Sequence, residues 1–147
     1  MNKWDQRFLE MAAKISEWSK DPSRKIGCIA VNNDRKILAT GYNGFPSKIE
    51  DHEYRYNDRE TKYQYVIHAE MNCIYNAAVN GVSLLDSTFY IHGLPVCHEC
   101  AKGIIQVGVT RVVAHSAGTP EKWADSNILT MELFKEAGVE YEFNEIH

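Results

Sequence analysis

The sequence lacks the features that would indicate a membrane, secreted, disordered or fibrous protein. It has no run near the roughly 18 consecutive apolar residues that a membrane-spanning helix needs. Its first ten residues, MNKWDQRFLE, carry charges throughout and lack the apolar stretch of a signal peptide. Gly and Pro are not abundant, so neither disorder nor a fibrous repeat is indicated. We therefore expect a cytoplasmic protein with no membrane partner.

An excess of positive charge is also lacking. The 16 Lys and Arg are outnumbered by 20 Asp and Glu, which gives a formal net charge of -4. Such a chain has no general attraction for DNA, RNA or an anionic membrane. We expect no nucleic-acid partner, although a local basic pocket is compatible with this charge.

The four cysteines lack the second pair that a closed four-thiolate zinc site needs. Cys97 and Cys100 form one Cys-x-x-Cys pair, and no second pair accompanies it. Cys28 and Cys73 stand alone, and we predict that each is a small buried hydrophobe. A metal site in a reducing compartment explains this usage better than disulfides do.

Periodicity predicts the order of the elements. A helix is expected over residues 2–19, with a core face made by Trp4, Phe8, Met11, Ile15 and Trp18. A hairpin over 26–32 and 36–42 and a long, partly helical polar excursion over 47–64 follow. Further helices are expected at 68–80, 97–107 and 123–137, the last with Ile128, Leu129, Leu133 and Phe134 towards the core, and further strands at 88–92, 110–114 and 139–143.

Helices that alternate with short strands predict an α/β sandwich around one sheet. The chain has 147 residues, 44% of them hydrophobic, which suits one domain with its own core. We predict a single domain over residues 1–147. The order of the strands cannot be read from the sequence.

Two short motifs carry the chemistry. His68, Cys97 and Cys100 supply three zinc ligands, the number typical of a catalytic site that leaves the fourth position open. Glu70, two residues after His68, can project beside the metal without binding it. His-x-Glu with Pro-Cys-x-x-Cys is the described signature of zinc nucleobase deaminases, although Val96 here separates the proline from the first cysteine.

The chain resembles the deoxycytidylate (dCMP) deaminases of the zinc-dependent cytidine deaminase superfamily through nearly its whole length. The segments that carry the resemblance are Trp18 to Ser23, Ile26-Gly27, Gly41 to Pro46, Lys62-Tyr63, His68 to Asn72, Cys97 to Lys102 and Ile104 to Gly108. The zinc motifs are common to the superfamily, whereas the Gly-Tyr-Asn-Gly loop and the Glu-Cys-Ala-Lys segment are more specific. The loop over 115–118 departs from relatives that carry a tyrosine there.

The resemblance implies a three-layer sandwich with a mixed five-stranded sheet flanked by helices. It implies hydrolytic deamination of dCMP to dUMP and ammonia by a homo-oligomer, a hexamer or a dimer, with activation by dCTP, inhibition by dTTP and Mg²⁺ bound with dCTP. His68, Cys97 and Cys100 would bind one catalytic Zn²⁺ per subunit, and Glu70 would be the proton shuttle. The implied substrate-binding residues are Asn43, Arg24, Ser23 and Ala69, and the implied effector-binding residues are Gly41, Tyr42 and Gly44.

Other functions are compatible with the same motifs. The enzyme could act on free cytidine or deoxycytidine, on another base, or on a base within tRNA or single-stranded DNA, although the acidic charge disfavours the last. A zinc-stabilised scaffold without catalysis is a further alternative. It does not explain why Glu70 accompanies a three-ligand site.

Overall fold

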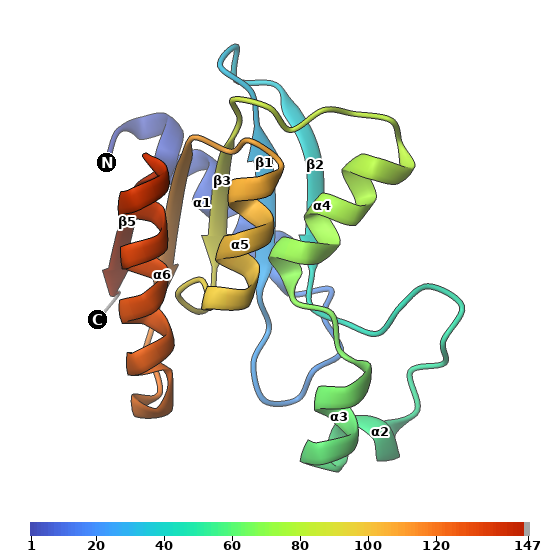
Figure 1. Cartoon of the computed structure of the whole chain (residues 1–147). Coiled ribbons are helices and arrows are strands. Elements are labelled where there is room, and N and C mark those ends of the chain that lie inside the picture. The colour runs from blue at the N-terminus through green and yellow to red at the C-terminus, as the bar shows by residue number, and fades with distance from the viewer. Residues whose placement is uncertain (146–147) are drawn as a thin grey trace.

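A five-stranded sheet in the order β2-β1-β3-β4-β5 forms the middle layer of the computed structural model, which describes residues 1–145 (Figure 1). The strands are β1 (Gly27–Val31), β2 (Ile37–Tyr42), β3 (Thr88–His92), β4 (Arg111–Ser116) and β5 (Glu140–Glu145). β1 runs antiparallel to both of its neighbours, β2 and β3, while β3, β4 and β5 are parallel. The predicted mixed sheet and the predicted hairpin are confirmed.

Helices cover both faces of this sheet. α1 (Lys3–Ser16) packs on one face, and α4 (Ala69–Val79), α5 (His98–Gln106) and α6 (Ala124–Ala137) cover the other (Figure 1). The short helices α2 (Glu53–Asn57) and α3 (Arg59–Tyr65) lie beyond one end of the sheet, and the 3-10 turn η1 (Glu121–Trp123) precedes α6. This is the predicted three-layer sandwich. No helix within residues 1–145 is long and apolar enough to cross a membrane.

The core face of α1 differs from the predicted one. Phe8 is buried as expected, but Met11 and Trp18 are exposed, at 43% and 62% of their surface. Ala12 faces the sheet instead. A Cβ atom on Gly27 of β1 would collide with the Ala12 carbonyl, so α1 can pack this closely on β1 only at a glycine. Trp18 follows the end of the helix and therefore lies off its buried face.

The predicted core face of α6 is also partly wrong. Phe134 is buried, whereas Ile128 and Leu129 are exposed, Ile128 at 56% of its surface. The buried line of the helix runs through Thr130 and Phe134, which are one turn apart. The Thr130 hydroxyl donates a hydrogen bond to the Val96 carbonyl at 2.8 Å, so a polar contact sets the rotation of this helix.

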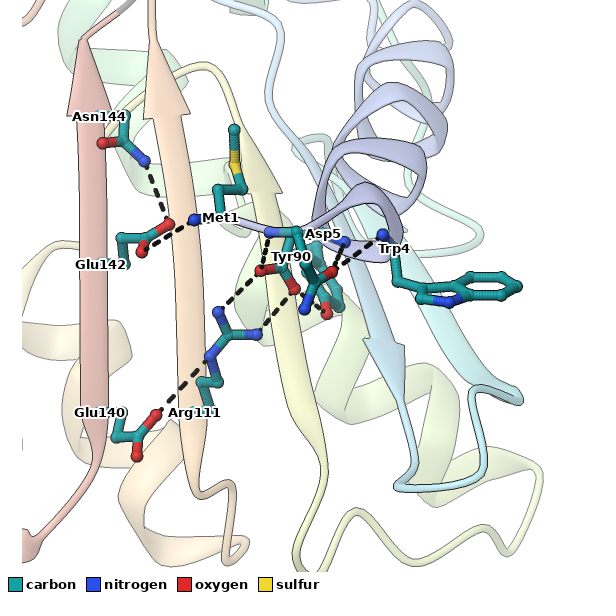
Figure 2. A network of polar contacts seen from close by, with 9 residues as sticks. Met1, Trp4, Asp5, Tyr90, Arg111, Glu140, Glu142 and Asn144 are labelled. Atoms are coloured by element: carbon teal, nitrogen blue, oxygen red, sulfur yellow. Dashed lines mark hydrogen bonds and ion pairs between the residues drawn. The ribbon is translucent and has the colours of Figure 1, made fainter.

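A buried carboxylate ties the start of α1 to the sheet. Asp5 is 1% exposed and accepts hydrogen bonds from Arg111 Nη1 at 2.8 Å, Arg111 Nη2 at 2.9 Å and the Tyr90 hydroxyl at 2.8 Å (Figure 2). It also accepts from the Asn2 backbone N–H, while the Asn2 side chain caps the helix in return. The bonds from Arg111 hold the pKa of Asp5 well below its usual range.

Replacing Asp5 with Asn should lower the free energy of unfolding by about 3 kcal/mol, because the Arg111 guanidinium loses its buried charge partner and, within residues 1–145, keeps only the exposed Glu140 carboxylate at 3.7 Å. Urea unfolding at pH 7 measures this loss. The matched variant Tyr90→Phe removes one neutral donor and should cost about 1 kcal/mol. Equal stability of Asp5→Asn and the wild type would contradict the structural role of this network.

The same network predicts a pH dependence. The folded-state pKa of Asp5 is depressed below its unfolded value of about 3.9, so its stabilisation is complete above that value and disappears as pH falls towards the folded-state pKa. The stability difference between the wild type and Asp5→Asn should therefore stay constant from about pH 7 to 5 and shrink below about pH 4. Urea unfolding midpoints of the wild type and of Asp5→Asn, measured across this pH range, test whether the stability difference shrinks as the pH falls.

Candidate metal centre and active site

The starts of two helices bring the three predicted zinc ligands together. His68 is the N-cap of α4, Cys97 is the N-cap of α5, and Cys100 lies in the first turn of α5. Their ligand atoms lie within 4.8 Å of one another, with His68 Nδ1 3.4 Å from each Sγ atom. Tetrahedral zinc, with Zn–S near 2.3 Å and Zn–N near 2.0 Å, would separate sulfur and nitrogen by about 3.5 Å. The three side chains therefore fit a zinc ion.

Close packing of α4 on β2 fixes one side of this cluster. A Cβ atom on Gly41 would lie 2.5 Å from the Ala69 carbonyl, so only glycine lets the helix approach the strand this closely. Asn72 of α4 also donates a hydrogen bond to the Tyr42 carbonyl at 2.8 Å. Together these contacts hold the start of α4, and with it His68, against the edge of the sheet.

The additional residue between the proline and the first cysteine is accommodated in the core. Val96 is buried, its N–H donates to the Tyr141 hydroxyl at 3.2 Å, and its carbonyl accepts from Thr130. Cys97 still caps α5, with its sulfur accepting the Cys100 N–H at 3.4 Å. Val96 therefore leaves the cysteine ligands in the arrangement that a metal requires.

The ligands influence one another's protonation. The hydrogen bond that Cys97 shares with Cys100 lowers the pKa of Cys97 to about 4 and, with burial, raises the pKa of Cys100. The hydrogen bond to Cys97 raises the pKa of His68 to about 9. Because zinc binds thiolates and neutral imidazole, metal binding at this cluster must release protons.

Glu70 lies beside the cluster without belonging to it. The side chain is buried, and the three-residue group whose ligand atoms converge does not include its carboxylate. Burial raises the pKa of Glu70 to about 7, the range in which a carboxyl group can both accept and return a proton. This arrangement of a three-ligand site and a separate carboxyl suits hydrolytic chemistry.

A pocket of about 320 Å³ opens onto His68, Cys97 and Glu70. Ser23, Arg24, Asn43 and Ala69, the four residues that the resemblance implied for substrate binding, all line it. Ile26, Val66, Leu94 and Trp123 give it apolar walls, which suit a flat base.

The Asn43 side chain is largely occupied by the protein itself. Its Oδ1 accepts the Ile26 N–H at 2.9 Å, and its Nδ2 donates to the Arg24 carbonyl at 2.9 Å and to Asp21 at 3.5 Å. Asn43 thus fixes the loop that precedes β1. Asn43 lines the pocket, and among residues 1–145 its oxygen accepts only this one hydrogen bond of the two that an amide oxygen can accept.

Arg24 links two loops at the pocket. It is half-buried, and its Nη1 donates a hydrogen bond to the Gly118 carbonyl at 2.7 Å. The segment over 115–118, in which β4 ends and the sequence departs from some relatives, therefore supports this arginine. The remaining guanidinium donors are available for a ligand.

Gly41, Tyr42 and Gly44 lie outside this pocket. Gly41 is buried against α4, Gly44 pairs with Ile67 in a β-bridge, and Tyr42 is exposed with its ring 6.2 Å from that of Trp18. The structure thus separates the three positions implied for effector binding from the pocket that contains the implied substrate contacts.

The sequence interpretation missed several polar residues of the pocket. Asp21, Arg59, Lys62, Tyr63 and Lys122 line it together with the predicted residues. Asp21 and Lys62-Tyr63 lie in segments that carry the family resemblance, but the resemblance gives them no role, and the polar character of residues 47–64 predicts only a long, partly helical excursion. No local pattern in the sequence marks Lys122, because η1 brings it to the pocket only through the fold of the whole chain.

Comparison with known proteins agrees with this geometry. The family described as the cytidine and deoxycytidylate deaminase zinc-binding region matches residues 2–116. The chain belongs to this family. The deoxycytidylate deaminase of Mus musculus is 38% identical over 145 residues, which cover 94% of this chain and 78% of that protein. The human deoxycytidylate deaminase is 37% identical with the same coverage.

Solved structures of the family share the fold. The crystal structure of dCMP deaminase from the cyanophage S-TIM5 in apo form superposes with a TM-score of 0.77 at 25% identity and covers 98% of this chain and 100% of that chain. The structure of the same enzyme with dCMP and dUMP gives a TM-score of 0.77 at 26% identity, covering 98% and 99%. The family and the fold predicted from the sequence are confirmed.

We predict that the protein binds one zinc ion through the three-residue cluster and that Cys97→Ser abolishes this binding. Elemental analysis of the purified protein should give about one zinc per chain for the wild type and near zero for the variant. Cys73→Ala, which removes a buried thiol outside the cluster, is the matched control and should keep its zinc. A chelator should lower the melting temperature of the wild type and of Cys73→Ala, but not that of Cys97→Ser.

Proposed function

We propose that the protein is a zinc-dependent hydrolase that converts dCMP and water to dUMP and ammonia. The observation that carries this proposal is that the three-ligand cluster presents His68 and Cys97 to the same pocket that the buried Glu70 lines. The curated relatives are deoxycytidylate deaminases, and the phage enzyme was crystallised with dCMP and dUMP, which supports this substrate.

His68, Cys97 and Cys100 would hold the zinc ion. When bound, zinc supplies a Lewis acid that lowers the pKa of a coordinated water from about 15.7 towards 7. Glu70 would then move both protons of the water. It takes the first as the water attacks C4 and passes it to N3 of cytosine; it then takes the second from the new C4 hydroxyl and gives it to the amino group, which leaves C4 as ammonia while the C4 carbonyl forms. The apolar walls hold the base and exclude bulk water.

The rest of the pocket would bind the sugar and the phosphate. Asn43 offers one acceptor position to a sugar hydroxyl while its other bonds fix the adjacent loop. Arg24 is proposed to bind the 5′-phosphate, because a guanidinium matches phosphate oxygens in a bidentate manner. Ser23 and Ala69 line the same pocket and complete the proposed substrate contacts.

Glu70→Gln should keep the zinc but lose nearly all activity. The amide has a similar shape but cannot carry the proton, and general acid–base help is typically worth about 10²- to 10⁴-fold in rate. Zinc content and the rate of ammonia release, measured on the same preparation, separate the two effects. A variant that keeps its zinc and most of its activity would remove Glu70 from the mechanism.

The substrate itself is tested by ammonia release and the ultraviolet change with dCMP, CMP, deoxycytidine and dCTP. We expect dCMP to give the highest kcat/KM. A preference for deoxycytidine would mean that the pocket does not use the phosphate. Inactivity on all four compounds would favour another base, a nucleic-acid substrate or a zinc scaffold.

Regulation and assembly are proposed from the family resemblance. We propose that residues 1–147 act as one domain in a cytoplasmic homo-oligomer, a hexamer or a dimer, which dCTP with Mg²⁺ activates and dTTP inhibits. The position of Gly41, Tyr42 and Gly44 outside the pocket supports an effector site distinct from the substrate site. Sedimentation velocity and rates of dCMP turnover with and without dCTP and Mg²⁺ test these proposals.

A further inference from the structure

Three cations of the pocket have no anionic partner among residues 1–145. Arg24 bonds the neutral Gly118 carbonyl, Lys122 Nζ donates to the neutral Tyr63 hydroxyl at 3.3 Å, and Arg59 forms no ion pair in this part of the chain. Lys62 differs, because its ammonium lies 3.4 Å from the buried Asp21 carboxylate. A chain with a net charge of -4 thus places three uncompensated positive charges around one pocket.

Tyr63 holds two of these cations together. Its hydroxyl accepts the hydrogen bond from Lys122 of η1, and the Arg59 guanidinium carbon, from the first turn of α3, lies 5.9 Å from the centre of its ring. Burial alone would raise the pKa of Tyr63, but the hydrogen bond from Lys122 and the positive charges of Lys122 and Arg59 outweigh it and lower this pKa. The lowered pKa of Tyr63 thus indicates a strongly positive environment where α3 and η1 come together.

Both cations are exposed and held by neutral groups, so an incoming anion has no carboxylate to displace. A nucleoside 5′-phosphate carries about -1.5 to -2 charges at pH 7 and three acceptor oxygens, more than one guanidinium can satisfy. Arg24 reaches the pocket from the loop before β1, whereas Arg59 and Lys122 reach it from α3 and η1. A phosphate at this position would be contacted from separate chain segments.

We propose that Arg59 and Lys122, positioned by Tyr63, form a second wall of the phosphate subsite and determine the preference for nucleotide over nucleoside. The inference rests on the proposed deamination of dCMP and names further residues that select its substrate. Arg59 and Lys122 bind the phosphate directly, and Tyr63 is a positioning residue that holds the Lys122 ammonium. The uncompensated charge also draws the anionic substrate towards the pocket from solution.

The test compares Arg59→Gln, Lys122→Met and the double variant on dCMP and on deoxycytidine. Each single change should lower kcat/KM for dCMP about 10-fold, the effect of losing one charge-assisted hydrogen bond, and leave deoxycytidine unchanged. Tyr63→Phe should give a smaller loss that is again confined to dCMP. The dependence of kcat/KM for dCMP on salt concentration should become shallower in the double variant.

The matched control is Lys14→Met, which removes one exposed lysine from α1 on the opposite face of the sheet. This variant should leave kcat/KM for dCMP, kcat/KM for deoxycytidine and the ratio of the two values unchanged. The proposal is overturned if Arg59→Gln and Lys122→Met lower dCMP and deoxycytidine turnover by the same factor, or change neither. Melting temperatures close to that of the wild type show that the exposed substitutions leave the fold intact.

Binding of dUMP and deoxyuridine to the zinc-loaded protein, measured by calorimetry, separates this proposal from the proposed function. Tighter binding of dUMP that is lost in the double variant supports the second wall even if the wild type deaminates neither substrate, in which case only the proposed function fails. If dUMP binds the wild type and the double variant equally, the second wall is overturned while the deamination of dCMP stands.

Discussion

The site depends on the meeting of two helix starts on one face of the sheet. His68 and Cys97 are 29 residues apart in the chain, yet both are N-caps, so their side chains project from the ends of α4 and α5 rather than from their sides. The N-terminal end of a helix carries partial positive charge, which favours the thiolates that a metal needs. The contact of Gly41 with α4 and the buried Val96 before α5 fix where these ends lie.

Features that depend on local spacing could be predicted from the sequence. Cys97 and Cys100 are three residues apart, and a helix start after Cys97 places both at one end, whatever the rest of the chain does. The rotation of whole helices could not be predicted in this way. Met11 and Ile128 fit apolar stripes, but α1 turns Ala12 towards Gly27, and a hydrogen bond from Thr130 sets α6.

The walls of the pocket were the least predictable part. Tyr63 and Lys122 are 59 residues apart and belong to a short helix and a 3-10 turn whose meeting depends on the whole fold. Asn43 is predicted from the sequence as a ligand contact because its amide can both accept and donate hydrogen bonds. In the structure the same amide binds the protein backbone, accepting from the Ile26 N–H and donating to the Arg24 carbonyl. A sequence shows which groups a side chain offers, and the fold decides which of them are already used.

The distribution of charge explains how an acidic chain can take an anionic substrate. Attraction for polyanions requires positive charge spread over a surface, and a net charge of -4 opposes it. A small nucleotide needs only a few cations within reach of one phosphate. The chain places Arg24, Arg59 and Lys122 around a single pocket and neutralises Lys62 with Asp21, so its positive field is local. The fold can thereby favour a mononucleotide over nucleic acid through the position of its charges alone, without a specific contact that distinguishes the two.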